Sequence, residues 1–106
     1  MTEADIRAPD IADLAAAAAL AVPGVSGLHG GEFGTVATYL PGRRITGISI
    51  GADACAVHVI LRYPADLIAT ADRVRDAVRA VVGVPVDVTI EDLTDELPHD
   101  ETGPRT

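Results

Sequence analysis

The residues that could do chemistry gather in two short stretches of the sequence. The first, AVPGVSGLHGGEFG at positions 21–34, places His29 and Glu32 among several glycines. The second, GISIG at positions 47–51, matches the G-x-S-x-G pattern that surrounds a nucleophilic serine. These stretches raise three possibilities to test, namely a phosphate-binding loop, a metal site and a serine nucleophile.

The glycine-rich stretch has the wrong context for a phosphate-binding loop. A dinucleotide-binding fingerprint follows a strand and opens a helix, whereas these glycines follow an expected helix and precede an expected strand. No lysine lies nearby to bind phosphate, and the carboxylate of Glu32 would repel it. We therefore interpret the stretch as the turn that ends a helix, where glycine adopts a positive φ at low cost.

The serine pattern also lacks its structural context. A nucleophile elbow needs a strand, a sharp turn and a helix in that order. Ser49 instead lies within the alternating segment RITGISIG at positions 44–51, and a further strand is expected after it. We interpret Ser49 as a strand residue that faces solvent.

Five residues have side chains that could bind a metal: His29, Glu32, Cys55, His58 and His99. A metal site usually needs three or four converging ligands. Cys55 and His58 are three residues apart in an expected strand, so they point to opposite faces. We expect no metal, no cofactor and no catalytic residue, and we expect His58 to be a surface histidine.

The charge of the chain argues against nucleic-acid binding. The 106 residues carry a formal net charge of −8 and include two Tyr, one Phe and no Trp, whereas nucleic-acid binding favours a basic stripe with stacking aromatics. The adjacent acids Glu91-Asp92 and Asp95-Glu96 are typical of a solvated surface. They do not indicate a paired general acid and base.

The sequence predicts a cytoplasmic protein that does not insert into a membrane. The single cysteine permits no intrachain disulfide. The first ten residues are acidic where a signal peptide is basic. The apolar run 11–22 is too short to span a bilayer and contains Asp13.

The spacing of apolar residues predicts the elements that position these side chains. We expect helices at 9–22 and 65–82, and strands at 35–40, 44–51, 55–63 and 86–92. The order α-β-β-β-α-β predicts an α+β fold in two layers, with two helices on one face of a small mixed sheet. Residues 1–8 are expected to be a flexible N-terminus, 9–93 a single domain and 94–106 an acidic disordered tail.

The two helices present apolar stripes that should cover the same face of the sheet. These stripes are Ile11, Leu14, Ala15, Ala18 and Val22 in the first helix, and Leu67, Ala71, Val74, Val78 and Val81 in the second. The opposite face is left as a candidate interface, formed by Tyr39, Ile45, His58, Ile60 and Arg62. Isoleucine, tyrosine and arginine together are typical of interface cores, although single exposed apolar residues are also common on ordinary surfaces.

Two segments resemble the alkaline-shock-protein family of Gram-positive bacteria, in an actinobacterial-type member. IADLAAAAALAVPGVSGLHGG at 11–31 is similar to the opening pattern I-A-x-x-A-A-x-x-V-x-G-V-x-x-L of that family. GISIGADACAVHVILRYPADLIATADRVRDAVRAVVGVPVDVTIEDL at 47–93 is similar to the remainder, including the valine-rich strand that ends in Tyr63 and the closing V-x-V-x-[IV]-x-D-[LI]. The resemblance covers about residues 11–93.

The resemblance implies a non-enzymatic scaffold or adaptor of the cell-envelope stress response. It implies self-association, and a membrane-anchored protein partner at the cytoplasmic side of the membrane. The chain departs from the family pattern in two places. Family members often have a strand before the first helix, which MTEADIRAP does not supply. The usual Tyr-Gly after the valine-rich strand is Tyr63-Pro64 here. Two alternatives stay open: a small-molecule-binding regulatory domain, and an iron–sulfur assembly factor, which would need a reactive cysteine where Pro64-Ala65 stands.

Overall fold

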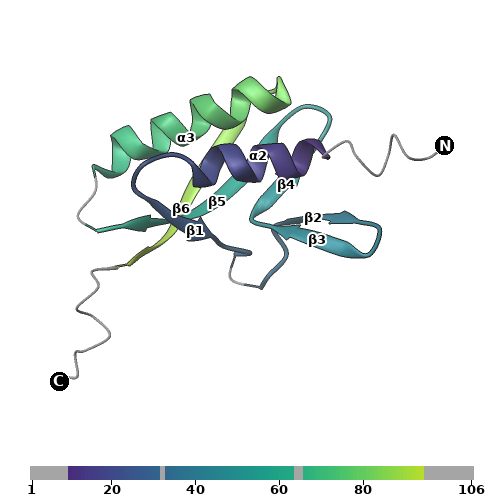
Figure 1. Ribbon diagram of the computed structural model, residues 1–106, viewed down its shortest axis with the longest axis horizontal. Coiled ribbons are helices and arrows are strands. Elements are labelled where there is room, and N and C mark those ends of the chain that lie inside the picture. Colours follow the sequence, from purple (N-terminus) through teal and green to yellow (C-terminus); the bar gives the residue numbers. More distant parts are fainter. Residues whose placement is uncertain (1–9, 32, 64–65, 95–106) are drawn as a thin grey trace.

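A computed structural model describes residues 10–31, 33–63 and 66–94 of the chain. Within these residues the elements follow one another in the order that can be traced in Figure 1: α2 (Ile11–Leu20), β1 (Val25–Leu28), β2 (Ala37–Leu40), β3 (Arg43–Thr46), β4 (Ile48–Ile50), β5 (Cys55–Arg62), α3 (Leu67–Val82) and β6 (Val86–Thr94). The expected α+β fold is confirmed, with both helices packed on a mixed sheet.

Strand β5 is the centre of the main sheet. Along one edge it pairs antiparallel with β1 near its C-terminal end and with β4 near its N-terminal end. Along the other edge it pairs with β6, and this pairing is parallel. Strands β1 and β4 therefore lie end to end along the same edge of β5.

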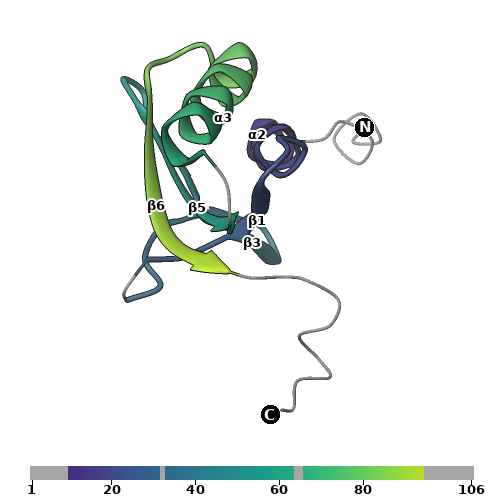
Figure 2. The ribbon, with the colours of Figure 1, turned by 90° about the vertical axis from the view of Figure 1, so that its left-hand side faces the viewer.

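The core lies between the sheet and the two helices, which sit side by side on one face (Figure 2). The residues of β5 alternate as its period predicts, because Cys55, Val57, Val59 and Leu61 are all buried. From α3, Val74 and Val78 are fully buried against them. This part of the sequence-based core is confirmed.

Both helices begin at an aspartate that caps the first turn. The Asp10 side chain accepts a hydrogen bond from the Ala12 amide, and Asp13 completes a capping box by accepting from the Asp10 amide. The Asp66 side chain accepts from the Ala69 amide. Gly83 ends α3 with a φ of 75°, the left-handed conformation that glycine adopts most readily.

The expected apolar stripe of the first helix is wrong for its two largest residues. Ala12, Ala15 and Ala19 are fully buried, whereas Ile11 is 42% exposed and Leu14 is 46% exposed. The physical reason is packing distance, since a face of small side chains lets α2 approach α3 and the sheet more closely. The large side chains are consequently on the solvent side.

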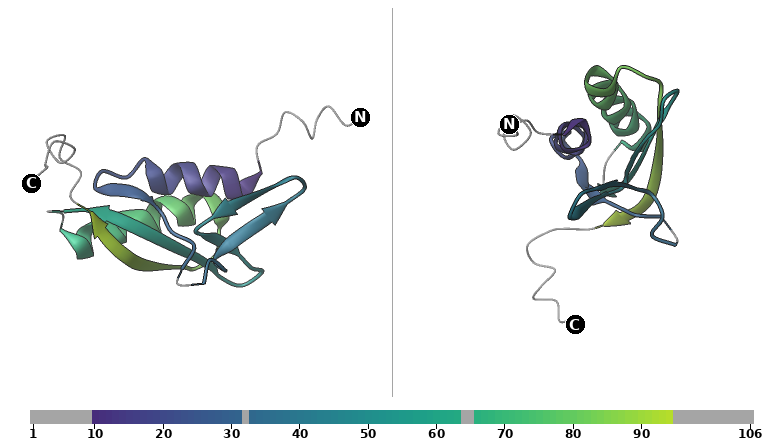
Figure 3. Two further views of the ribbon diagram at one scale, coloured as in Figure 1. Left: turned by 90° about the horizontal axis from the view of Figure 1, so that it is seen from below. Right: turned by 90° about the vertical axis from the view of Figure 1, so that its right-hand side faces the viewer.

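The strands before β5 also differ from the prediction. Residues 25–28, expected to be part of a turn, form β1, and the expected strand 44–51 is divided into β3 and β4 at Gly47, whose φ is 86°. Strands β2 and β3 form a separate two-stranded sheet that extends from the body (Figure 3). Thr94 belongs to β6 and not to the tail; residues 95–106 lie outside the described residues, as do residues 1–9.

Candidate interaction surface

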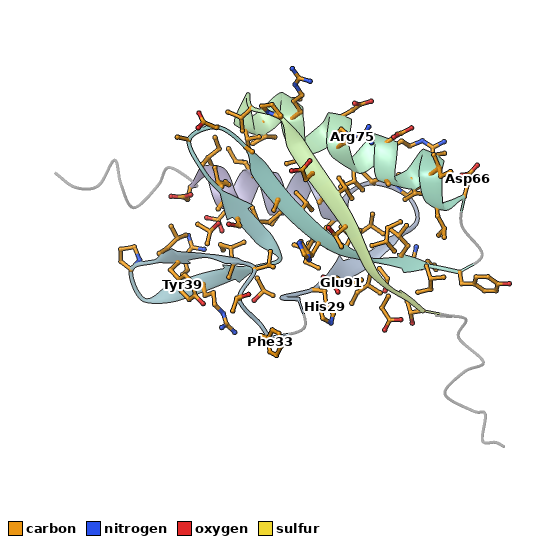
Figure 4. All side chains as sticks on the ribbon, turned by 180° about the vertical axis from the view of Figure 1, so that it is seen from behind. His29, Phe33, Tyr39, Asp66, Arg75 and Glu91 are labelled. Atoms are coloured by element: carbon orange, nitrogen blue, oxygen red, sulfur yellow. The ribbon has the colours of Figure 1, made fainter. Side chains whose placement is uncertain are left out.

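The candidate interface lies mainly on the face of the sheet that the helices leave uncovered. His58, Ile60 and Arg62 alternate with the buried residues of β5, so their side chains point away from the helices. Figure 4 views the molecule from this side. Ile60 is half-buried and Arg62 is exposed.

The glycine-rich loop after β1 packs against this face at His58. The His29 amide donates to the His58 carbonyl at 3.0 Å, and the His58 amide donates to the Gly47 carbonyl at 2.9 Å. At Gly31, where φ is 83°, a Cβ atom would lie 3.1 Å from Cγ2 of Val36 and 4.0 Å from Nδ1 of His58. The glycine therefore permits the close approach of the loop to the sheet.

The imidazole of His58 is paired with the carboxylate of Glu91 through Nδ1 and Oε2. Their side chains are only 19% and 20% exposed, so the expectation of a simple surface histidine is wrong. Glu91 occupies a β-bulge, because the register passes from Val59 opposite Ile90 to Ile60 opposite Asp92. An extra residue of this kind redirects a side chain.

The contact between His58 and Glu91 differs from the sequence-based expectation, in which Glu91 and its neighbour Asp92 are solvated acids. A signal for it exists in the sequence. His58 and Glu91 both lie on the polar positions of their strands, so a parallel pairing of the two strands brings them to the same face. The bulge itself has no comparable signal.

The other residues with possible chemistry do not join this pair. Cys55 is buried on the opposite face, and Nδ1 of His29 accepts a hydrogen bond from the Gly31 amide at 2.9 Å. Ser49 lies within β4, opposite Ala56. Among the described residues no three His, Cys, Asp or Glu side chains are placed to hold a metal; Glu32 and His99 lie outside these residues.

The hairpin of β2 and β3 separates two of the expected interface residues. Tyr39 pairs across the strands with Arg44, and its side chain is 66% exposed. Ile45 pairs with Thr38 and packs against the core cluster, so its expected place on the open face is wrong. The Thr38 hydroxyl donates to the Ile48 carbonyl at 2.6 Å and ties this side of the hairpin to the main sheet.

An ion pair links the same hairpin to α2. The Arg43 guanidinium donates two hydrogen bonds to the Asp13 carboxylate, each 2.7 Å long. The hydrogen bond from Arg43 is the main cause that lowers the pKa of the Asp13 carboxyl. The only carboxylate within α2 is therefore neutralised by a neighbour.

The chain places many of its large apolar side chains on the surface. All three aromatic residues are exposed, with Phe33 at 82%, Tyr39 at 66% and Tyr63 at 59%. The aliphatic members of this set are Ile11, Leu14, Leu20, Ile68 and Leu93. The buried core, in contrast, consists largely of valine and alanine.

Comparison with family models, with curated proteins and with solved structures finds no significant match to this chain. Within the residues that the structure describes, neither helix has the length and apolar character needed to cross a membrane.

Proposed function

We propose that this chain is a non-enzymatic scaffold or adaptor that acts through self-association and protein partners. In line with the family resemblance, its place is the cytoplasmic side of the cell envelope, where a membrane-anchored partner holds it during the stress response. The observation that carries the proposal is the distribution of side-chain size. Many of the large apolar residues are on the surface, where aromatic and aliphatic side chains are typical of contact sites.

The outer face of α2 is the surface best suited to a second copy of the chain. Ile11, Leu14 and Ala18 follow one another at helical spacing, and Ile11 and Leu14 are nearly half exposed. This face bears no charged side chain within the helix, and the nearby Asp13 is paired with Arg43. Two molecules that each carry a net charge of −8 repel one another least where such uncharged faces meet.

The size of the patch indicates weak, reversible association. Complete burial of an Ile or Leu side chain contributes about 1.5–3 kcal/mol, so burying the exposed half of Ile11 and Leu14 contributes about 1 kcal/mol each. Two copies then gain about 4 kcal/mol from these side chains, so the association is weak. Added salt should strengthen the association, because it screens the repulsion between the copies.

Sedimentation equilibrium of the full chain at low and high salt tests this proposal. We expect concentration-dependent association that L14E abolishes without changing the circular dichroism spectrum. The matched control is I68E on α3, where the side chain is 77% exposed, and I60D examines the open sheet face in the same way. A wild-type chain that stays monomeric at millimolar concentration and high salt would exclude self-association.

The envelope location has a separate test in fractionated cells. We expect the tagged chain to sediment with membranes in stressed cells and to leave them after treatment that strips peripheral proteins. A chain that stays entirely in the soluble fraction under every stress would contradict this part of the proposal.

One observation favours a second candidate function, a small-molecule-binding regulatory domain. The half-buried imidazole of His58 is oriented by Glu91 beneath the glycine-rich loop, and polar groups fixed in this way commonly orient a bound ligand. A metabolite that raises the melting temperature of the wild type, but not of H58A, would support this function.

A further inference from the structure

Strand β6 has one edge that the described part of the chain leaves open. It pairs with β5 along one side, and no other described strand pairs along its second side. Figure 2 shows β6 at the border of the sheet. An open edge of this kind presents backbone N–H and C=O groups that can pair with another extended chain.

The usable part of this edge is short. The register with β5 is regular from Val86 to Ile90 and changes at Glu91. Because a bulge disrupts the regular pattern of hydrogen bonds, a strand added at the edge would follow 86–90 and end near the bulge.

The charges of β6 argue against a second copy as the occupant. The strand carries Asp87, Glu91 and Asp92 and no basic residue. Asp87 and Asp92 are exposed, and among the described residues neither one takes part in an ion pair. Two β6 edges side by side would bring carboxylates close together, which is destabilising, whereas a basic segment would gain from the same charges.

The two faces of β6 also determine the pattern of the occupant. On the open face of the sheet the edge presents Asp87 and Thr89, which are exposed. On the helix side, Val88 and Ile90 pack against the core but are only half-buried. A strand beside them therefore places basic side chains on one face and apolar side chains on the other, since successive residues alternate.

We propose that the edge of β6 at 86–90 binds an extended segment of a partner protein in which basic and apolar residues alternate. The inference rests on the proposed function, because it names the kind of partner that the adaptor would bind. Main-chain hydrogen bonds provide the affinity, and the carboxylates provide the preference for a basic segment. The site differs from the α2 face, so each can fail without the other.

The test uses the full chain and a short fluorescent peptide in which lysine and valine alternate. We expect saturable binding in fluorescence anisotropy, with amide shifts in NMR spectra centred on 86–90. Added salt should weaken this binding, the reverse of its effect on self-association. A peptide with the same residues in two blocks should bind more weakly, because its basic side chains do not share one face.

Two further comparisons separate edge pairing from general attraction of charges. N-methylation of alternate peptide bonds keeps every side chain but removes main-chain donors, so it should abolish binding. The double variant D87N/D92N should bind about three- to tenfold more weakly than the wild type. The control variant D53N/D76N removes the same two negative charges from exposed aspartates outside β6, so it should bind like the wild type.

Three results would overturn the inference. They are equal binding of the N-methylated peptide, an equal loss of affinity in D53N/D76N, and protection of the 86–90 amides that grows with protein concentration alone. The last result would identify a second copy as the occupant. Peptide binding that persists in L14E would show that the edge functions even if self-association fails.

Discussion

Replacing Gly47 by alanine tests the junction that holds the glycine-rich loop, β4 and β5 together. Gly47 is buried and has a φ of 86°. A Cβ atom there would lie 2.8 Å from Cβ of Leu28 and 3.1 Å from both the His29 amide nitrogen and the His58 carbonyl oxygen. Two of these three atoms belong to the backbone, so the clash cannot be relieved by a side-chain rotation.

The structure separates two contributions to the cost of G47A. The left-handed conformation costs an L-residue about 1–2 kcal/mol, and overpacking in a tight site costs about 1–3 kcal/mol more. We therefore expect the free energy of unfolding to fall by about 2–5 kcal/mol. The matched control is G42A, where φ is 78° and nothing lies within 4 Å of the added Cβ; it should lose only about 1–2 kcal/mol.

Urea unfolding followed by circular dichroism measures both variants. With a slope of about 1–3 kcal/mol per molar urea for a small domain, the midpoint of G47A should fall by about 1–5 M, or the variant should be unfolded without urea. If G47A loses no more stability than G42A, the contacts around Gly47 do not constrain the fold, and the reasoning is refuted.

Two further predictions concern titratable groups. The hydrogen bond from Arg43 lowers the pKa of the Asp13 carboxyl in the folded chain, so its stabilising effect is present above the unfolded value of about 3.9 and is lost as pH falls through the folded value. In an NMR titration, R43Q should raise the pKa of Asp13 towards its ordinary value; an unchanged pKa would show that the pair does not persist in solution. Burial raises the pKa of the Cys55 thiol, so little thiolate forms near neutral pH, and a disulfide reagent should label Cys55 slowly in buffer and rapidly in urea. Rapid labelling of the folded chain would contradict the burial of this side chain.

The elements with strict periodicity could be predicted from the sequence. In β5 the alternation of apolar residues identifies the buried face without reference to any other element. The same holds for α3, where Val74 and Val78 lie opposite a charged surface. Helix α2 is different, because it is apolar on nearly every side. Its pattern does not specify the buried face, and tertiary packing selects the alanines over Ile11 and Leu14.

The remaining differences come from backbone geometry that residue types do not reveal. Ile45 and Ile48 are three residues apart, so an uninterrupted strand would point them to opposite faces. Both contact the core because the backbone turns at Gly47. The contact of His58 with Glu91 likewise depends on pairing between distant strands and on a bulge. The open sheet face is therefore predictable in outline, and a parallel pairing of the two strands places His58 and Glu91 on it, but their contact at the bulge is not predictable.

The arrangement of β1 and β4 end to end along β5 has a consequence for how this fold can change during evolution. The residues that flank the segment 30–46 are both hydrogen-bonded to the main chain of His58, so the segment leaves the sheet and returns to it at a single point. Doubling the length of a loop whose two ends meet in this way costs only about 0.6 kcal/mol in chain entropy. The main sheet and helices can thus stay constant while the segment 30–46 is lengthened, shortened or exchanged. The contacts of Thr38, Arg43 and Ile45 with the main sheet, α2 and the core would then have to be replaced.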